Sequence, residues 1–373
     1  MFATTATPKP VADLPPGEGK PPRVSVVIPC RNERAHIEGC VRDLFAQEPV
    51  PGGIEVLVAD GRSDDGTREH LLQLAAEFPG LRMIDNPGRI VPTGLNSAIR
   101  AAKGEIVIRV DAHTRYARDY LKQCVDELAR TAADNVGGPW VAKGHGYVSR
   151  AVAAAFQSPL VMGGARGHDT AYEGYADTVY LGCWRREAFS RFGLFDEELV
   201  RNQDDELNLR ITRNGGRVWQ SAKIRSEYSP RNSIRAVFRQ YSQYGYWKVR
   251  VIQKHRLPAS PRHLVPGAFV ACMLLLAPLA CLSGWARLAL LIVTSAYLAA
   301  NFLASAHSAA RSSFTLLPIL PVIVAAFQMG YGLGFLRGLL DFVILRRGPD
   351  ARFTMLTRPP EPGHGADGRQ GLH

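Results

Sequence analysis

Three long stretches without Asp, Glu, Lys or Arg constrain this chain more than any other feature. They cover residues 264 to 286, 288 to 310 and 312 to 336, and only Arg287 and Arg311 separate them. A helix rises about 1.5 Å per residue, so roughly 20 apolar residues cross the ~30 Å hydrocarbon core of a bilayer. Each stretch is long enough to cross, and helices buried in a water-soluble core are the alternative. The sequence therefore predicts membrane helices near its C-terminal end.

The rest of the chain is large enough for a separate water-soluble domain. A single hydrophobic core rarely grows beyond about 250 to 300 residues, so 373 residues predict at least two parts. The first 22 residues are rich in proline and lack the apolar core of a signal peptide. We therefore expect the soluble part to stay in the cytoplasm.

Charge and cysteine content narrow the partners. The net charge of +11 is spread along the chain and forms no basic block or nucleic-acid motif. Anionic lipid and a phosphate-bearing substrate fit this charge better than nucleic acid does. The six cysteines form no C-x-x-C pair, so neither a zinc site nor a disulfide framework is indicated, and a reduced cytoplasmic setting follows.

The first part of the chain alternates between strand and helix patterns. The apolar, β-branched segments 24–29, 54–60, 81–85 and 105–111 are typical of strands. Helical spacing of apolar residues follows each of the first three, in NERAHIEGCVRDLFAQ, DDGTREHLLQLAAEF and TGLNSAIRAA. Strands separated by helices of this length predict a parallel sheet covered by helices, hence an α/β domain.

Polar residues stand where three of these strands end. They form PCRNE (29–33), DGRSDDG (60–66) and DAHT (111–114). In parallel sheets ligands bind beyond the carboxyl ends of the strands, so we expect these segments at one binding edge. No G-x-G-x-x-G opens the first helix and no G-x-x-x-x-G-K-[ST] is present, which disfavours dinucleotide binding and a P-loop.

Two of these segments suggest specific chemistry. Asp60 is placed to accept hydrogen bonds from a base N–H or a ribose hydroxyl, or else Asp60 and Ser63 only cap the next helix. Asp111 and His113 are two residues apart on an extended segment and point the same way, so together they could hold a cation. Mg²⁺ or Mn²⁺ there would neutralise a diphosphate leaving group. The alternative is a strand-end aspartate beside a surface histidine.

Two later segments are also suggestive. Asp204, Asp205 and Glu206 precede a helix, where they either stabilise its dipole or supply a general base. The segment 232–256 mixes aromatic and basic residues in a pattern typical of an amphipathic helix at a membrane surface, with a soluble surface helix as the alternative. Its aromatics could also stack on sugar rings.

These motifs in this order resemble family 2 glycosyltransferases with the inverting GT-A fold, closest to the membrane-associated succinoglycan-type (ExoA-like) enzymes. The resemblance covers roughly residues 23 to 340. It rests on VSVVIPCRNE, VLVADGRSDDGT, IRVDAHT, GCWRREAF with FGLFDE, NQDDELNLR, and QYSQYGYWK followed by apolar segments.

The resemblance implies a domain organisation. We expect a GT-A catalytic domain with a mostly parallel central sheet, followed by transmembrane helices. The segments are a flexible tail (1–22), the GT-A domain (23–230), a basic amphipathic interfacial segment (231–262), the transmembrane helices (263–346) and a second flexible tail (347–373).

The resemblance also implies roles for residues. Pro29, Arg31, Glu33 and Asp60 would line the nucleotide pocket. DAH stands where most relatives carry D-x-D, so Asp111 and His113 would hold the divalent metal, with Mn²⁺ favoured over Mg²⁺ by the imidazole, unless His113 does not ligate. The Glu-Asp pair of the acceptor region aligns with Gln203 and Asp204. Asp204 is therefore the expected base, with Asp205 and Glu206 as alternatives.

The implied function is a single displacement with inversion at the sugar. A hexose would move from a nucleotide-diphosphate sugar, a UDP-sugar above all, to a polyprenyl-diphosphate-linked glycan, in exopolysaccharide or cell-surface glycan synthesis. The enzyme would be a multi-pass protein of the bacterial cytoplasmic membrane, with its catalytic domain in the cytoplasm and other polysaccharide-assembly proteins as possible partners. The alternatives are a processive synthase, disfavoured because Q-x-x-R-W is absent, and a non-catalytic membrane scaffold.

Membrane topology stays open at this stage. Three crossings would put the C-terminal end outside, whereas Arg337, Arg346, Arg347 and Arg352 favour the cytoplasmic side. Either one apolar stretch is re-entrant or interfacial, or GLLDFVIL (338–345) helps complete a fourth crossing. The sequence does not specify the sugar, the linkage, the acceptor or the oligomeric state.

Overall fold

A mixed eight-stranded sheet organises the first part of the chain. The computed structural model describes residues 24–355, so the expected tail 1–22 and most of the expected tail 347–373 lie outside the described residues. The strand order is β3-β2-β1-β4-β9-β6-β10-β8. Four of its seven strand pairs are parallel and three are antiparallel, which confirms the predicted α/β fold with a mostly parallel sheet.

A small three-stranded sheet, in the order β5-β11-β7, lies beside the large one. The strands of the large sheet are β1 (Val24–Cys30), β2 (Ile54–Asp60), β3 (Leu81–Asp85), β4 (Ile106–Arg109), β6 (Asn135–Gly138), β8 (Gly174–Tyr175), β9 (Tyr180–Arg185) and β10 (Val218–Gln220). Those of the small sheet are β5 (Thr114–Tyr116), β7 (Val141–Ala142) and β11 (Ser226–Tyr228).

Helices cover both faces of the large sheet, because apolar side chains of its strands point alternately to either side. In β1, Val26 and Ile28 pack into the core formed with one group of helices, while Val27 packs into the opposite core. The first group is α1 (Ile37–Phe45), α2 (Thr67–Glu77) and α4 (Tyr120–Thr131). The second group is α3 (Val91–Ala101), α6 (Glu187–Phe192) and α7 (Gln203–Arg213).

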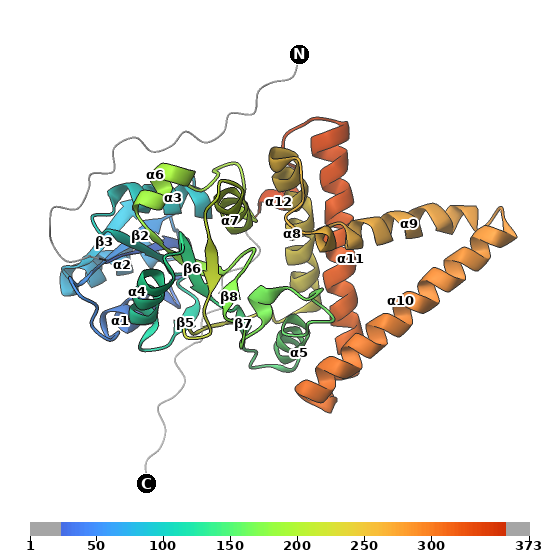
Figure 1. Ribbon diagram of the computed structural model, residues 1–373, viewed down its shortest axis with the longest axis horizontal. Coiled ribbons are helices and arrows are strands. Elements are labelled where there is room, and N and C mark those ends of the chain that lie inside the picture. The colour runs from blue at the N-terminus through green and yellow to red at the C-terminus, as the bar shows by residue number, and fades with distance from the viewer. Residues whose placement is uncertain (1–23, 356–373) are drawn as a thin grey trace, which may run out of the picture.

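The second part of the chain is helical and extends away from the sheet (Figure 1). Three helical segments are long and apolar enough to cross a membrane, namely Pro261–Leu279, Gly284–Arg311 and Leu320–Ile344. The long helices of this part are α8 (Ile234–His255), α9 (Val265–Leu279), α10 (Gly284–Arg311) and α11 (Leu320–Gly338), and α5 (Tyr147–Phe156) precedes them in the chain. The short ones are η1 (Arg166–His168), η2 (Pro261–His263), η3 (Phe314–Leu316), the π-helical η4 (Leu339–Ile344) and α12 (Ala351–Thr354).

Helix α8, expected as an amphipathic helix at a membrane surface, packs along one side against α11. Glycines of α11 lie against the backbone of α8, so the two backbones touch. A Cβ added to Gly334 would lie 1.9 Å from the carbonyl oxygen of Ser242, and one added to Gly330 would lie 2.7 Å from that of Phe238. The ring of Tyr241 also stacks on that of Phe327 in α11, with 4.1 Å between their centroids. The aromatic side of α8 is therefore buried against protein, a contact that amphipathic periodicity alone does not distinguish from lipid.

Residues 347–355 also differ from the expected free tail. The indole Nε1 of Trp247 donates a hydrogen bond of 2.9 Å to the carbonyl oxygen of Phe353. The ring of Phe353 stacks on Tyr246, with 4.1 Å between centroids. Aromatic residues on α8 thus hold the segment after α11 in place.

Candidate active site

A cleft of about 1120 Å³ opens at the carboxyl ends of β1 and β4. The strand order reverses between these two neighbours, and such a switch point is where open α/β sheets bind ligands. The polar part of its wall comes from the residues after β1, the residues after β4 and the start of α7. Helices α8 and α11 close the other side.

Arg109 joins the two acidic groups of this cleft. It is the last residue of β4 and only 5% exposed. Its Nε donates a 3.1 Å hydrogen bond to Asp111 Oδ1, and its Nη1 donates to the carboxylate of Asp204, which is 95 residues further along the chain. Burial lowers the pKa of Arg109, but the carboxylates of Asp111 and Asp204 outweigh it, so the net shift of that pKa is upward.

Sequence reasoning missed Arg109, although a signal was present. Arg109 stands two residues before Asp111 at the end of a strand, and residues two apart point to the same side of an extended chain. A basic residue beside a candidate metal carboxylate is therefore placed to pair with it.

Asp204 lies in the cleft as a carboxylate with a raised pKa. Burial raises the pKa of Asp204 to about 6; Arg109 opposes this, and the charges of Asp111 and Asp205 add to it. The side chain is nevertheless 34% exposed, so it can exchange a proton with a ligand or with water in the cleft. A carboxylate of this kind is suited to general base catalysis near neutral pH.

Asp205 lines the same cleft but is held differently. Its Oδ2 lies 2.5 Å from Nζ of Lys248 on α8. Burial raises the pKa of Asp205, but Lys248 outweighs that effect and the net pKa is below the usual value. Asp205 is thus a paired anion, less able to take a proton than its neighbour.

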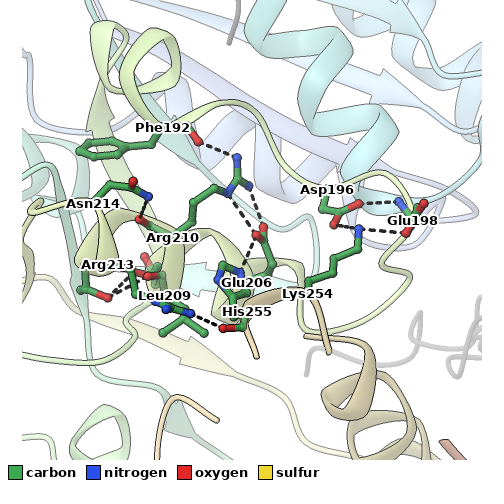
Figure 2. A network of polar contacts seen from close by, with 12 residues as sticks. Phe192, Asp196, Glu198, Glu206, Leu209, Arg210, Arg213, Asn214, Lys254 and His255 are labelled. Carbon is green, nitrogen blue, oxygen red and sulfur yellow. Dashed lines mark hydrogen bonds and ion pairs between the residues drawn. The ribbon is translucent and has the colours of Figure 1, made fainter. Parts of the chain in front are cut away.

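Glu206 does not line the cleft, which corrects its place among the candidate bases. It is 3% exposed and lies between Arg210, with Nη2 at 2.7 Å, and His255, with Nε2 at 3.0 Å. Figure 2 shows this pairing. Successive residues of a helix point about 100° apart, so the three acids in a row cannot all face one cleft. Two face the ligand side and Glu206 faces the junction with α8.

The residues expected around the nucleotide lie at or beside the cleft. Pro29, Arg31 and Glu33 line it, and Glu33 Oε1 is 3.0 Å from Nδ1 of His113. Asp60 stands next to Cys30 in the β1–β2 register but is fully buried and forms no part of the cleft wall.

The carboxylate of Asp60 organises the loop behind it. It accepts a 2.6 Å hydrogen bond from Ser63 Oγ and a 3.0 Å bond from Arg68. The N-cap residue of α2 is Gly66, and the backbone N–H of Thr67 at the first helical position donates a 3.0 Å hydrogen bond to Asp65. Asp60 and Ser63 therefore do not cap that helix.

The side chains at the cleft can hold a divalent metal only if oxygens of a bound substrate complete its coordination. Among residues 24–355 no group of three or more His, Cys, Asp and Glu side chains is arranged to hold an ion. Asp111 and His113 both line the cleft. Mg²⁺ is usually bound by one or two carboxylates together with phosphate oxygens and water, so Asp111 fits such a shared site, with His113 beside it.

The far part of the cleft is aromatic. Trp140 stacks on Tyr180, with 5.1 Å between ring centroids. The wall of the cleft continues from this pair through Tyr228 and Tyr331 to Val265, the first residue of α9. The indole Nε1 of Trp140 and the hydroxyl of Tyr331 are buried without a hydrogen-bond partner among the described residues. No sequence motif marked these residues, because tertiary packing brings them together from separate segments.

The chain resembles known proteins in sequence. Residues 25–192 match the family described as Glycosyl transferase family 2. The succinoglycan biosynthesis protein ExoA of Rhizobium meliloti (strain 1021) is 35% identical over 243 residues, covering 65% of this chain and 73% of that protein. The dolichyl N-acetyl-alpha-D-glucosaminyl phosphate 3-beta-D-2,3-diacetamido-2,3-dideoxy-beta-D-glucuronosyltransferase of Methanococcus voltae is 27% identical over 62% of this chain and 74% of that protein.

The fold agrees with these sequence matches. The mannosyltransferase PcManGT from Pyrobaculum calidifontis, solved in complex with GDP-Man and Mn²⁺, superposes with a TM-score of 0.54 at 22% identity, covering 91% of this chain and 90% of that one. At that identity the likeness shows the fold alone, a GT-A fold. With the ExoA match over most of that protein's length, it leads to one conclusion: this chain belongs to glycosyltransferase family 2 and is a glycosyltransferase of the GT-A fold.

Proposed function

We propose that this glycosyltransferase moves a hexose from a nucleotide-diphosphate sugar, a UDP-hexose above all, to a polyprenyl-diphosphate-linked glycan, with inversion at the sugar. The product serves exopolysaccharide or cell-surface glycan synthesis. The observation that carries the proposal is that Arg109 holds Asp111 and Asp204 together in one cleft that reaches the apolar helices.

The reaction needs one base and one leaving group. The carboxylate of Asp204 takes the proton of an acceptor hydroxyl, and that oxygen forms a bond to the anomeric carbon. The bond from this carbon to the diphosphate breaks on the opposite side, and the nucleoside diphosphate leaves with the electron pair. With a pKa of about 6, Asp204 is mostly ionised at pH 7, and such a base contributes about 10²- to 10⁴-fold in rate.

The donor occupies the polar half of the cleft. Pro29, Arg31 and Glu33 surround the nucleotide, and Asp60 orders the loop beside it. Asp111 and His113 hold a divalent metal, Mn²⁺ or Mg²⁺, which when bound neutralises the charge of the diphosphate.

The acceptor occupies the aromatic half of the cleft. Trp140 and Tyr180 offer stacked faces, and aromatic faces are a usual surface for sugar rings. Because the cleft extends to the foot of α9, a glycan bound there can remain attached to a lipid in the bilayer. Two relatives are named for succinoglycan biosynthesis and for transfer to a dolichyl-linked sugar phosphate, and these names support a lipid-linked glycan as the acceptor.

The experiment is a donor screen with purified membranes and with the purified protein plus extracted lipid. UDP-glucose, UDP-galactose and GDP-mannose are each supplied with Mn²⁺ or Mg²⁺, and nucleotide release is measured with and without the lipid. We expect lipid-dependent release with one donor and none from Asp204→Asn. Absence of release with every donor would favour the non-catalytic scaffold, and products many sugars long would favour the processive synthase.

The proposed location is the bacterial cytoplasmic membrane, with the catalytic domain facing the cytoplasm. The three apolar helical segments support membrane association. Donor nucleotide sugars are charged and water-soluble, so the cleft must open on the side where they are made.

A further inference from the structure

The three apolar helical segments differ in how much of them the protein itself covers. In the most apolar windows of Pro261–Leu279 and Gly284–Arg311, 11% and 17% of the residues are buried, against 50% for Leu320–Ile344. Figure 1 shows α9 and α10 extending away from the rest of the chain while α11 runs beside α8. Large apolar side chains are exposed along the first pair of helices, namely Leu274, Leu275, Leu279, Leu288, Leu291, Ile292, Leu298, Phe302 and Leu303.

Helix α11 is bound to a helix that cannot enter a bilayer cheaply. Phe238 of α8 contacts Gly330 of α11, and eight residues later in both helices Tyr246 contacts Gly338. The two helices therefore run parallel, with their backbones in contact. The 22 residues of α8 include Arg235, Arg239, Lys248, Arg250 and Lys254. A Lys or Arg placed at the centre of a bilayer is costly because its charge loses its hydration. If α11 crossed the membrane, α8 would have to cross with it.

Two of the lysines of α8 form ion pairs with acidic residues of the catalytic domain. Lys248 pairs with Asp205 at 2.5 Å, and Lys254 pairs with Glu198 at 2.9 Å and also with Asp196. Figure 2 shows the second of these junctions. These ion pairs keep α8, and with it α11, on the water side of the bilayer.

Helix α11 also forms part of the catalytic cleft. Phe327, Gln328 and Tyr331, from the middle of the helix, line the same cleft as Asp111 and Asp204. In a membrane-crossing helix the middle residues would lie in hydrocarbon, where neither the polar glycan proposed for this half of the cleft nor the charged nucleotide sugar beside it would enter. The cleft therefore places the middle of α11 outside the hydrocarbon.

Both ends of the α9–α10 pair are fastened to the same domain. Just before α9, Arg262 Nη2 lies 2.5 Å from Asp177 Oδ2. Just after α10, the carbonyl oxygen of Thr315 accepts a 3.0 Å hydrogen bond from the hydroxyl of Tyr147 on α5. Two helices that leave one domain and return to it must cross the bilayer an even number of times.

The length and the tip of the pair fit a full crossing. Pro261–Leu279 has 19 residues and α10 has 28, which give about 28 Å and 42 Å of helix, against ~30 Å of hydrocarbon. At the turn between them Leu282 is 84% and Trp285 83% exposed, and Arg287 follows. Trp is enriched at membrane interfaces, and an Arg near a helix end reaches the head groups.

We propose that α9 and α10 form a two-crossing hairpin whose turn reaches the far head groups, and that α11 does not cross but walls the cleft on the catalytic side. The inference rests on the proposed membrane location and adds the topology. It also resolves the conflict in the sequence, because two crossings leave Arg337, Arg346, Arg347 and Arg352 on the same side as the catalytic domain, as the excess of positive charge on the cytoplasmic side requires.

The test is thiol labelling of the full-length protein with a membrane-impermeant maleimide, in right-side-out and inside-out vesicles. Cys281 at the turn is exposed, whereas Cys30, Cys40, Cys124 and Cys183 are buried, so Cys272→Ala leaves a near-native probe. Leu282→Cys repeats the measurement at the turn. In a Cys272→Ala, Cys281→Ser background, Asp43→Cys marks the catalytic domain, Ser312→Cys the end of α10, and Gly348→Cys the segment after α11, all at exposed positions.

We expect the probes at 43, 312 and 348 to react only in inside-out vesicles, and those at 281 and 282 only in right-side-out vesicles. Reaction of 348 on the side opposite to 43 would mean that α11 crosses, and would overturn the proposal. Turn probes that react on the same side as 43, or only after detergent, would show that the hairpin does not cross. Labelling needs neither donor nor acceptor, so its result is independent of whether the proposed transferase reaction is found.

Discussion

Nζ of Lys248 in the middle of α8 lies 2.5 Å from Oδ2 of Asp205 at the start of α7. One ion pair thus connects the helix that carries α11 with the acidic turn that supplies the proposed base. The catalytic cleft and the helical part of the chain are mechanically joined at this point.

Replacing Lys248 with Met should weaken this connection and leave Asp205 with no cation beside it. Breaking a buried ion pair by removing one partner costs about 3 to 5 kcal/mol, and the partial exposure of Asp205 places this case at or below the lower end. We expect a lower Tm and a lower kcat, with Lys248→Arg recovering most of both. Thermal unfolding and nucleotide release measure the two effects; an unchanged kcat in Lys248→Met would show that the pair is not needed for the reaction.

Asp204→Asn should lower kcat by about 10²- to 10⁴-fold or more while nucleotide binding is retained, because the amide cannot accept the proton. In the unchanged enzyme, kcat should fall as the pH drops through about 6, since the protonated acid is no longer a base. Steady-state rates between pH 5 and 8, with calorimetric titration of UDP, measure both. A rate independent of pH over this range would argue against Asp204.

Arg109→Met should move the fall of kcat at low pH, the acidic limb of the pH profile, to higher pH. The guanidinium of Arg109 holds down the pKa of Asp204 against burial, so its removal raises that pKa further and protonates the base at neutral pH. Arg109→Lys keeps the charge and should shift the limb less. The measurement is the pH profile of kcat in all three proteins, and identical profiles would contradict the assigned role.

Glu206→Gln should lower the free energy of unfolding and leave kcat unchanged. Glu206 is buried between Arg210 and His255, and loss of its charge should cost about 3 to 5 kcal/mol of folding free energy. Burial raises the pKa of Glu206, but His255 and Arg210 outweigh it, so the net pKa is lowered. Such a group stabilises above its unfolded pKa of about 4.3 and loses this effect as the pH falls through the folded pKa.

The difference in stability between Glu206→Gln and the unchanged protein should therefore be full at pH 7 and shrink in acid. Denaturant unfolding at several pH values measures it, and the exposed Glu48→Gln is the matched control. A large loss of kcat at unchanged stability would return Glu206 to the candidate bases.

Gly334→Val should prevent α8 and α11 from meeting. A Cβ there would lie 1.9 Å from a backbone oxygen, which no side-chain movement relieves. We expect little folded protein in detergent by size-exclusion chromatography. Gly284→Ala is the control, because nothing lies within 4 Å of its added Cβ. Equal yields of the two variants would mean that the contact between the helices is not required.

Local patterns were sufficient to predict the layers of the fold. The alternation in β1 and β2, the helical spacing after each strand and the polar strand ends all depend on neighbours a few residues apart, so the sequence alone predicted the α/β domain and where its ligand edge lies. The three uncharged stretches likewise followed from composition and length.

Contacts between distant residues decided the rest. The pairing of Arg109 with Asp204 spans 95 residues, and which of three consecutive acids enters the cleft depends on how α7 is rotated against its neighbours. Helix α11 is apolar enough to cross a bilayer, yet its glycines let it pack against α8, so its surroundings and not its composition determine where it lies. Periodicity and hydropathy report how a segment folds and how apolar it is, whereas its partner is chosen by shape and charge that only tertiary packing brings together.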